Sequence, residues 1–421
     1  MPDAVARFQS TFMRTFAERG YYNDCTDPAA LDALFGQARV TAYIGFDCTA
    51  PSLHVGSLVQ IMTLRRLQQA GHKPIVLMGG GTTKVGDPSG KEETRQLLTR
   101  EQIEANKQSI LGSFKRFMSF DGGETGAIMA DNAEWLDRLE YIPFLRDVGR
   151  HFSVNRMLTM DSVRLRLERE QPLTFLEFNY MILQSYDFLE LYRRYGCRLQ
   201  CGGSDQWGNI VSGIDLARRI DNAQVFGLTS SLITTASGAK MGKTAQGAVW
   251  LNADMCSPYL YWQYWRNTED ADIGRFLRLF TDMPLAEIVR LERLEGSERN
   301  EAKKILATEA TALCHGREAA EEAAATARRT FESGEIAAGL PTVEIPREKL
   351  ESGMLVANLA HLAGLTSSSG EARRLIQSGG IRLNDTSVAD VKAVAGLADL
   401  TAEGVLKISV GRKKHALIKP V

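Results

Sequence analysis

Residues 40–78 read VTAYIGFDCTAPSLHVGSLVQIMTLRRLQQAGHKPIVLM, and this stretch decides the fold class. The apolar runs Val40–Phe46 and Pro74–Met78 have the length of buried strands. Between them, Val59–Ala70 carries a helical pattern. Strands that alternate with helices in this way are typical of a parallel α/β sheet.

The alternation continues to about Ile233, with further strand-like runs at Ile128–Ala130 and Arg198–Cys201. In such sheets the ligand binds beyond the carboxyl ends of the strands. The segments Tyr43–His54 and Gly79–Lys91 both leave strand ends, so we expect the ligand-binding residues there.

The rest of the chain divides into two further parts. From about Ser257 to Glu332 the pattern is helical, for example over Arg299–Arg329. Glycine and proline interrupt it over Ser333–Ile345, which indicates a linker, and Met354–Val421 follows as a small unit. We therefore expect domains at 1–235, 236–332 and 351–421, with a linker over 333–350.

Composition sets the outer bounds. The chain has 421 residues, 44% of them hydrophobic, and 50 basic against 51 acidic residues, so bulk charge gives no general attraction to nucleic acid. Cys197 and Cys201 would supply half of a zinc site, but no second pair follows at a suitable spacing. We expect no bound metal, no membrane span, reduced thiols and, without a signal peptide, a cytoplasmic protein.

Two short segments point to phosphate chemistry. Leu53–Ser57 sets His54 on a turn that opens a helix, where an imidazole and helix N–H groups can meet a polyphosphate. Lys240-Met-Gly-Lys243-Thr244 places two lysines on a loop, where they can hold the same phosphates. Each segment alone also fits a simpler interpretation, a helix-capping turn or a solvated lysine pair.

The last seventy residues concentrate positive charge. Ser369–Ile376 begins like a capped helix, and Gly379–Asn384 begins a strand and turn. Local charge of this density is typical of a surface that contacts a phosphate backbone, although charged residues are more often simply solvated. The basic residues are Arg373, Arg374, Arg382, Lys407, Arg412, Lys413 and Lys414.

Taken together, the chain resembles the bacterial-type tyrosyl-tRNA synthetases over nearly its whole length. The resemblance is carried by residues 43–50 (YIGFDCTA), 86–91 (GDPSGK), 179–187 (NYMILQSYD) and 202–209 (GGSDQWGN), and by the Lys240 loop. Residues 368–388 are similar to the helix-and-strand unit of S4 domains. The resemblance implies a Rossmann-like parallel-sheet catalytic domain, an α-helical domain and a small α+β S4-like domain.

The resemblance also implies a tyrosine pocket. The residues that match Tyr43 and Asp187 bind the substrate phenol, those that match Asp87, Tyr180 and Gln184 bind the amino group, and Gln206 lies near the carboxylate. The spacing of Tyr180, Gln184 and Asp187 puts them on one face of a helix. Spacing alone would equally fit an inert polar helix surface.

For ATP, the resemblance implies a second set of residues. GDPSGK also invites a P-loop interpretation, which we reject because the spacing is one residue short and Glu92 replaces the required Ser or Thr. The implied catalytic residues are His54, Lys91, Arg95, Lys240, Lys243 and Thr244, and the implied ATP-binding residues are Asp47, Thr49, His54, Gly56, Gly203, Asp205 and Lys243.

The implied reaction has two steps. Tyrosine's carboxylate attacks the α-phosphorus of ATP, and the acyl group then moves to the terminal ribose of tRNA(Tyr). Mg²⁺ is expected to arrive on ATP, with no other cofactor. Arg218, Arg219, Arg373 and Arg374 are expected to contact tRNA. The resemblance implies a homodimer with an interface near Phe144–Met157, although that segment's apolar residues would equally fit a buried core.

Three positions depart from the family's usual pattern. Ser57 replaces a second histidine, Ile44 replaces a polar residue near the ribose, and Lys84 lies in a loop that is often apolar; we expect Lys84 to be solvated. Competing hypotheses are a small nucleotidyltransferase, a synthetase for tryptophan, and a non-catalytic RNA-binding protein. The Tyr43 and Asp187 pair argues against the first two, and the intact lysines argue against the third.

Overall fold

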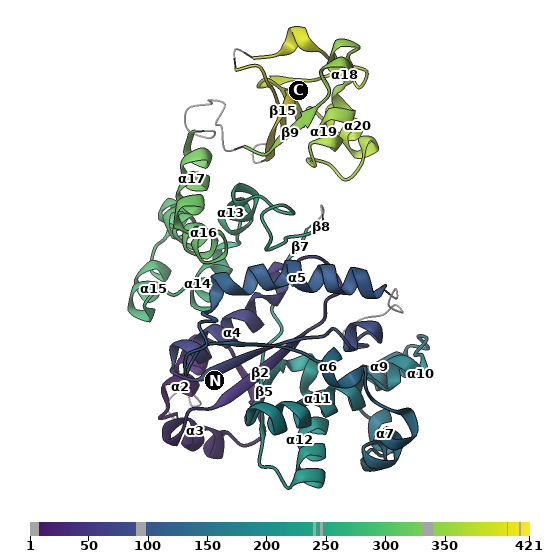
Figure 1. Cartoon of the computed structure of the whole chain (residues 1–421). Coiled ribbons are helices and arrows are strands. Elements are labelled where there is room, and N and C mark those ends of the chain that lie inside the picture. The colour runs from purple at the N-terminus through teal and green to yellow at the C-terminus, as the bar shows by residue number, and fades with distance from the viewer. Residues whose placement is uncertain are drawn as a thin grey trace. The chain divides into compact units, whose positions relative to one another are not determined.

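The structure is a computed structural model that describes residues 8–89, 98–238, 241–244, 247–329, 340–401, 403–411 and 414–421, with backbone only at 243 and 244. The chain forms two units. The first comprises Met1–Met241 and Ala271–Arg293, and the second comprises Gly242–Asp270 and Leu294–Val421. Figure 1 shows the labelled elements of both.

A six-stranded sheet forms the centre of the first unit, in the order β1-β6-β5-β2-β3-β4. All neighbouring strands are parallel except β1 and β6, which are antiparallel. The predicted α/β class and the four predicted strands are confirmed, and β1 and β6 are additions. The strands are β1 (Tyr22–Cys25), β2 (Thr41–Phe46), β3 (Lys73–Met78), β4 (Ile128–Asp131), β5 (Cys197–Gly203) and β6 (Phe226–Ser230).

Strand order locates the binding edge. From β2 the chain moves outward on one side through β3 and β4, and then returns to the other side of β2 through β5 and β6. Such a reversal opens a crevice at the carboxyl ends of the two central strands. The ends of β2 and β5 carry residues 43–46 and 202–203, which belong to two of the segments that carry the family resemblance.

Helices of the first unit cover the sheet. α4 follows the His54 turn and is buried along most of its length, and α11 packs on α12. The helices are α2 (Thr11–Glu18), α3 (Pro28–Gln37), α4 (Leu58–Gln69), α5 (Arg100–Phe117), α6 (Ala133–Leu136), α7 (Tyr141–Asp147), α8 (Val154–Leu158), α9 (Asp161–Glu168), α10 (Phe175–Phe178), α11 (Tyr180–Tyr195), α12 (Trp207–Asp221), α14 (Ile273–Phe280) and α15 (Leu285–Glu292).

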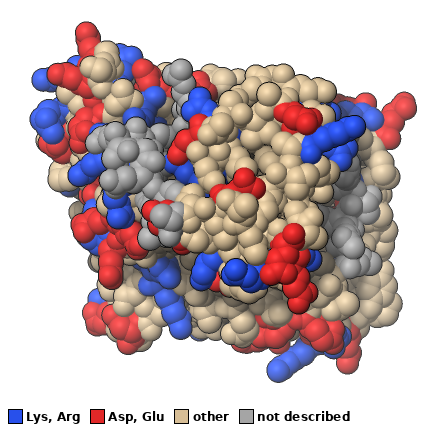
Figure 2. Space-filling model, turned by 90° about the horizontal axis from the view of Figure 1, so that it is seen from above, with Lys and Arg blue, Asp and Glu red and all other residues tan. Residues whose placement is uncertain are grey.

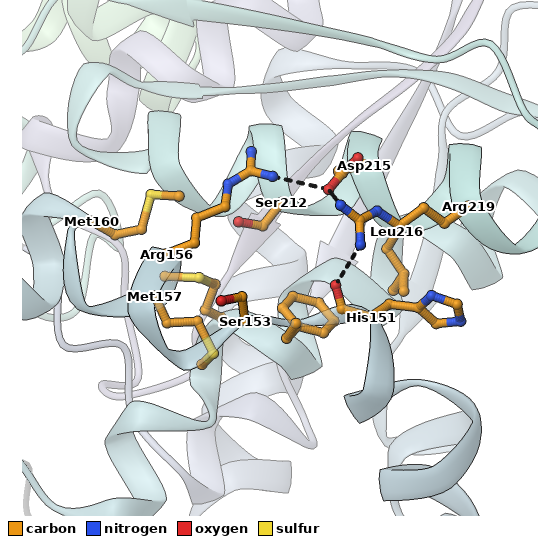
Figure 3. Close-up of a pocket in the computed structure, with 11 residues that line it drawn as sticks. His151, Ser153, Arg156, Met157, Met160, Ser212, Asp215, Leu216 and Arg219 are labelled. Atoms are coloured by element: carbon orange, nitrogen blue, oxygen red, sulfur yellow. Dashed lines mark hydrogen bonds and ion pairs between the residues drawn. The ribbon is translucent and has the colours of Figure 1, made fainter.

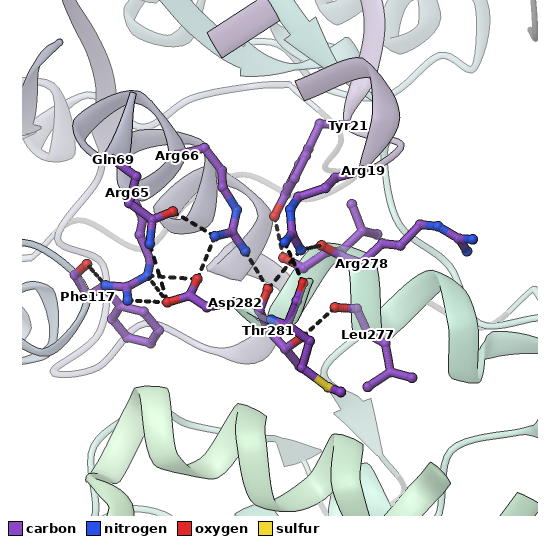
Figure 4. Close-up of polar contacts among 12 residues, drawn as sticks. Arg19, Tyr21, Arg65, Arg66, Gln69, Phe117, Leu277, Arg278, Thr281 and Asp282 are labelled. Atoms are coloured by element: carbon purple, nitrogen blue, oxygen red, sulfur yellow. Dashed lines mark hydrogen bonds and ion pairs between the residues drawn. The ribbon is translucent and has the colours of Figure 1, made fainter. Parts of the chain in front are cut away.

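A group of arginine contacts, which we call the Asp282 clamp, explains why α14 belongs to this unit although it comes late in the chain (Figure 4). Arg66 of α4 bonds Asp282 and the Thr281 carbonyl, and Arg65 also pairs with Asp282. Arg19 donates to the Arg278 carbonyl over 2.9 Å and to the Thr281 carbonyl over 3.0 Å. The carbonyls at the end of α14, which have no partner within the helix, are thereby satisfied.

The helical part of the second unit contains α13 (Pro258–Arg266), α16 (Arg299–His315) and α17 (Arg317–Arg328). The pattern over residues 299–329 is thus two helices, because Gly316 interrupts it with a φ of 93°, a backbone conformation that other residues rarely adopt. A short hairpin of β7 (Lys243–Thr244) and β8 (Gly247–Ala248) follows the first lysine of the signature segment.

Residues 340–421 form a small α+β fold around a five-stranded sheet ordered β12-β11-β14-β15-β9. Its helix α20 is capped by Ser368, whose hydroxyl accepts from Glu371 N, and its strand β11 leads into a turn, as the sequence predicts. The elements are β9 (Thr342–Ile345), α18 (Arg347–Glu351), β10 (Met354–Leu355), α19 (Val356–Leu362), α20 (Ser369–Gln377), β11 (Ile381–Leu383), β12 (Thr386–Ser387), β13 (Val394–Ala395), β14 (Leu406–Val410) and β15 (Lys414–Pro420).

The segment 333–350 was expected to be a linker, but its second half forms regular secondary structure. Residues 342–345 are strand β9, which pairs in parallel with β15, and α18 follows. Pro341 and Pro346 flank the strand instead of breaking it, because proline is tolerated at strand ends. Residues 333–339 lie outside the described part of the chain. Among the described residues, no helix has the length and apolar character to cross a membrane.

Candidate active site

The phenol end of the expected tyrosine pocket is built around Asp187 of α11. Its carboxylate accepts hydrogen bonds from Asn132 Nδ2 over 2.9 Å and from Trp135 Nε1 over 2.7 Å. Burial raises the pKa of Asp187 to about 8, because these neutral donors offset only part of the cost of a buried charge. The group therefore holds a proton at neutral pH more readily than an ordinary aspartate.

Tyr43 of β2 lies close to Asp187. Its side chain is 1% exposed, and its hydroxyl has no hydrogen-bond partner among the described residues. Burial and the nearby Asp187 raise the pKa of Tyr43 well above its usual value. A buried hydroxyl without a partner is costly, so this one marks a place where a ligand with a polar group belongs.

Tyr180 lies at the start of the same helix α11. Its hydroxyl lies 3.3 Å from both oxygens of Asp47, and Thr82 Oγ1 donates to Asp47 Oδ1 over 2.9 Å. Asn132 Nδ2 donates to Thr82 Oγ1 over 3.0 Å, which links this group to Asp187. Asp47, which the family resemblance assigns to ATP, thus also contacts a residue expected to bind tyrosine.

The other end of the expected pocket contains Asp87, Gln184 and Gln206. Gln206 Nε2 donates to Asp87 Oδ2 over 3.0 Å, and Gln184 Nε2 donates to Gln206 Oε1 over 3.2 Å. Asn209 Nδ2 donates to Gln184 Oε1 over 2.9 Å and fixes its orientation. Burial raises the pKa of Asp87, although bonds from Ser89 and Gln206 oppose the shift. The two ends of the expected pocket thus contain all six residues predicted to bind tyrosine.

Four residues of these networks were missed from sequence: Thr82, Asn132, Trp135 and Asn209. Asn132 directly follows strand β4, so the rule that ligands bind beyond strand ends would have found it. Trp135 follows Asn132 by three residues and Asn209 follows Gln206 by three, which is the spacing of neighbours on a helix face. Thr82 carries no comparable signal.

The His54 turn comes next. His54 Nδ1 accepts a hydrogen bond from Gly56 N over 3.0 Å, so the proton of the neutral ring lies on Nε2. A Cβ on Gly56 would lie 3.1 Å from the Met241 carbonyl. The two segments that the sequence singled out therefore approach each other closely, and glycine at position 56 permits the approach.

The remaining predicted ATP residues fall into two groups. Gly203 ends β5, and Asp205 and Thr49 are exposed on the turns after β5 and β2. Lys91, Arg95 and Lys240 lie outside the described residues, as do the side chains of Lys243 and Thr244. In the described ranges, no group of three or more His, Cys, Asp or Glu side chains has the arrangement of a metal site.

The three departures have separate structural outcomes. Ile44 is buried in β2, and Ser57 makes no side-chain capping bond at the start of α4. Lys84 is 28% exposed, and its Nζ lies 2.5 Å and 2.6 Å from the two oxygens of Asp137.

Arg218 and Arg219 gather with Arg156 around a single carboxylate, Asp215. Figure 3 shows Arg156 and Arg219 beside Asp215. The nitrogen-to-oxygen distances are 2.7 Å for Arg218, 2.9 Å for Arg219 and 3.0 Å for Arg156. Arg219 also donates to the His151 carbonyl over 3.1 Å, beside a small cavity of ≈ 50 Å³. Three guanidinium groups against one carboxylate leave an excess of positive charge.

In the C-terminal fold, Arg373 and Arg374 are exposed on α20, and Arg382 is exposed on β11. Lys407 does not belong to this basic surface, because it is 1% exposed and pairs with Asp385 over 3.0 Å. Arg412 and Lys413 lie outside the described residues. On the face shown in Figure 2, basic side chains are interspersed with acidic ones, so local clusters must supply any attraction to RNA.

Comparison with known proteins agrees with this geometry. Residues 36–332 match the model of class I tRNA synthetases (W and Y), and residues 332–418 match the tyrosine–tRNA ligase SYY-like C-terminal domain. The tyrosine–tRNA ligase of Nitrobacter winogradskyi is 63% identical over 416 residues, covering 99% of this chain and all of that protein. That of Bradyrhizobium diazoefficiens is also 63% identical, with the same coverage.

Among solved structures, a C-terminally truncated mitochondrial tyrosyl-tRNA synthetase of Aspergillus nidulans matches with a TM-score of 0.69 and 30% identity. The match covers 77% of this chain and 95% of that one. Since one family model spans more than half of the chain and close relatives match 99% of its length, the chain belongs to the tyrosine–tRNA ligase family of the class I tRNA synthetases.

Proposed function

We propose that the chain activates L-tyrosine with ATP to form tyrosyl-adenylate and pyrophosphate, and then transfers the tyrosyl group to the 3′-terminal ribose of tRNA(Tyr). One observation carries the choice of amino acid: the Tyr43 hydroxyl is buried beside Asp187 without a hydrogen-bond partner among the described residues. A substrate phenol supplies what this pair lacks.

The phenol end selects tyrosine because both groups are polar and buried. A tyrosine hydroxyl accepts from Tyr43 and donates to Asp187, whose orientation Asn132 and Trp135 hold. Phenylalanine would fill the same volume but leave these groups unpaired, a penalty of roughly 10⁴ to 10⁵ in kcat/KM for sites of this kind. That magnitude is the one already known for tyrosyl-tRNA synthetases that reject phenylalanine, and it does not come from this structure.

The other end of the pocket binds the amino acid backbone. An ammonium group needs acceptors, and Asp87, Tyr180 and Gln184 supply them, with Gln206 near the carboxylate. The contact of Gln206 with both Asp87 and Gln184 supports this assignment, because it holds the acceptors together. Backbone recognition and phenol recognition then fix the reacting carboxylate at one position.

ATP activation requires no protein nucleophile, because a carboxylate is already nucleophilic at neutral pH. The residues proposed around ATP are Asp47, Thr49, His54, Gly56, Gly203 and Asp205. Lys91, Arg95, Lys240, Lys243 and Thr244 are proposed around the departing pyrophosphate, whose growing charge they stabilise. The close approach of Gly56 to Met241 supports the idea that His54 and the signature lysines meet the same phosphates.

Mg²⁺ enters this reaction as part of the ATP substrate. Mg²⁺ prefers oxygen ligands and keeps several bound waters. In nucleotide-binding sites, the phosphates of the nucleotide usually supply most of its other ligands. We propose that ATP carries Mg²⁺ into the site and that the chain needs no dedicated metal cage.

For tRNA, we propose that Arg218 and Arg219 approach the acceptor end and that Arg373 and Arg374 contact the RNA backbone elsewhere. The surplus of guanidinium groups around Asp215 supports the first assignment. The division into three domains is likewise a proposal, and the meeting of the two family models at residue 332 supports its boundary between the helical and C-terminal domains.

A homodimer in the cytoplasm is the proposed working form. The segment expected at the interface has a mixed character: Val148 and Met157 are buried, whereas Val154 is 58% exposed. Tyr141 and Ile142, just before the segment, are also exposed. Exposed apolar groups in one region are typical of a surface that another chain covers, which supports this proposal.

The test is tyrosine-dependent exchange of pyrophosphate into ATP, with phenylalanine and tryptophan as alternative substrates. Exchange with tyrosine alone, and its loss in Lys243→Ala, is expected. Lys84→Ala is the matched control, because Lys84 is paired with Asp137, and it should retain exchange. A folded protein that binds tRNA without any exchange would instead favour the non-catalytic RNA-binding hypothesis.

A further inference from the structure

The signature segment is preceded by a turn that is bonded within itself and to α14. Gly238 N donates to the Thr235 carbonyl over 2.8 Å, which closes the turn. Ala236 N donates to Asp272 Oδ2 over 2.7 Å, and the Thr234 carbonyl accepts from Arg275. Two side chains from the start of α14 therefore hold the backbone that leads into residues 240–244.

Asp272 stands at the N-cap position of α14, but its side chain does not cap this helix with any bond among the described residues. An aspartate at this position normally accepts from the N–H groups of the first turn. Asp272 instead uses Oδ2 for Ala236 N and Oδ1 for Arg275, over 2.5 Å. Its side chain is 3% exposed, so water competes little for either interaction.

The other end of α14 is fixed by the Asp282 clamp. Arg66 and Arg19 bond the carbonyls at the end of the helix, and the Tyr21 hydroxyl donates to the Leu279 carbonyl. A short helix held at its last turn is a firm support for groups at its first turn. Asp272 and Arg275 therefore hold the turn at 234–238 in a fixed position. Met241, which comes soon after this turn in the chain, lies close to Gly56.

We infer that Asp272 and Arg275 are positioning residues for adenylate formation, because they hold the turn at 234–238, which directly precedes the signature segment proposed to act on pyrophosphate. This inference rests on the proposed function. Neither side chain is assigned a contact with substrate. Their effect is on geometry, and a displacement of about 1 Å in a catalytic group can cost roughly 10²-fold in rate.

The experiment compares Asp272→Asn and Arg275→Ala with the parent in tyrosine-dependent pyrophosphate exchange. Both variants are expected to lose at least about tenfold in kcat, while the KM for tyrosine stays within about twofold, because the tyrosine pocket is untouched. Arg275 is 42% exposed, so its removal leaves a folded protein even if Asp272→Asn does not.

Asp282→Asn is the matched control. It makes the same chemical change at the other end of α14, where Arg19 and Arg66 still bond the Thr281 carbonyl and hold the helix, so it should lower the melting temperature while kcat stays within about twofold. A second readout is transfer of tyrosine to tRNA from preformed enzyme-bound adenylate. No pyrophosphate leaves in that step, so both test variants should transfer at the parental rate.

Three results would overturn the inference: unchanged exchange kcat in Asp272→Asn and Arg275→Ala, an equal fall of exchange and transfer, or the same loss of kcat in Asp282→Asn. These results differ from a failure of the proposed function. In that case the parent itself would show no tyrosine-dependent exchange.

Discussion

The pocket around Asp187 and the clamp around Asp282 both hold a carboxyl group within the first unit, but different donors surround them. Asp187 receives hydrogen bonds from the neutral side chains of Asn132 and Trp135, and burial raises its pKa to about 8. Burial alone would also raise the pKa of Asp282, but the hydrogen bonds and charges of Arg65 and Arg66 lower it to about 2.

The difference separates a carboxyl group that is proposed to bind a substrate from one that holds helices together. Asp282 is satisfied by guanidinium groups within the protein. Asp187 lies beside a hydroxyl without a partner in the described structure, so its site is completed only when a polar ligand enters. A buried carboxyl group is thus better interpreted from its donors than from its burial.

The opposite pKa shifts of Asp187 and Asp282 also predict opposite effects of pH on the stability of the protein. The folded-state pKa of Asp187 is raised, so its contribution to stability is present at low pH and is lost as pH rises toward about 8. The folded-state pKa of Asp282 is lowered, so its contribution is present above about pH 4 and is lost as pH falls toward about 2.

The largest expected effect comes from Asp187→Asn. This change removes an acceptor from the phenol end and is expected to lower kcat/KM for tyrosine by roughly 10²-fold or more, since a buried hydroxyl would lose its partner. Steady-state pyrophosphate exchange measures it. Asp282→Asn should leave kcat/KM within about twofold; an equal loss in both variants would remove the distinction between pocket and clamp.

Arg66→Ala tests the clamp itself. Arg66 is 4% exposed and bonds Asp282 and the Thr281 carbonyl, so its loss should lower the free energy of unfolding by about 3 kcal/mol. Urea denaturation measures the change. Arg290→Ala, which breaks the exposed pair with Glu287, is the control and should cost under about 0.5 kcal/mol. Equal costs would show that the clamp adds nothing beyond a surface pair.

Tyr43→Phe should separate binding from stability within the pocket. The lost hydroxyl is buried and has no partner in the described structure, so the free energy of unfolding should not fall and should rise by up to about 1 kcal/mol. The dissociation constant for tyrosine, measured by equilibrium dialysis, should rise by about tenfold because one hydrogen bond is lost. A destabilised variant with unchanged affinity would make Tyr43 a structural residue.

The smallest effect is the acid sensitivity of the clamp. Between about pH 5 and pH 2 the parent should lose on the order of 1 kcal/mol more stability than Asp282→Asn, a figure reduced for the partial exposure of Asp282. Chemical denaturation across this range measures it. Parallel pH profiles for the two proteins would mean that Arg65 and Arg66 do not hold the charge of Asp282.

Sequence predicted the elements around Asp187 better than those of the clamp. The sequence predicted the α/β pattern and four of the six strands, because both depend on local periodicity. For the same reason it predicted that Tyr180, Gln184 and Asp187 share one helix. β1 was not, because Tyr22–Cys25 is short and half exposed, with Asn and Asp at its centre. β6, Phe226–Ser230, is a buried run of suitable length that was nevertheless not predicted.

The clamp could not be predicted because its partners are far apart in sequence. Arg65 meets Asp282 across 217 residues, and Arg19 meets the Arg278 carbonyl across 259. No periodic pattern encodes such contacts, and residues 271–293 look from sequence like part of the helical region that surrounds them. The prediction that Lys407 belongs to the basic surface was wrong for a related reason. A count of charges does not reveal which lysine is buried against a partner.

The central claim is that the phenol end makes this chain an activator of tyrosine. The most direct test is the ratio of kcat/KM for tyrosine to that for phenylalanine in pyrophosphate exchange by the parent protein. A ratio of roughly 10⁴ or more is predicted, because phenylalanine leaves Tyr43 and Asp187 unpaired. A ratio below about 10 would contradict the account, since one missing hydroxyl would then cost no more than an ordinary exposed hydrogen bond.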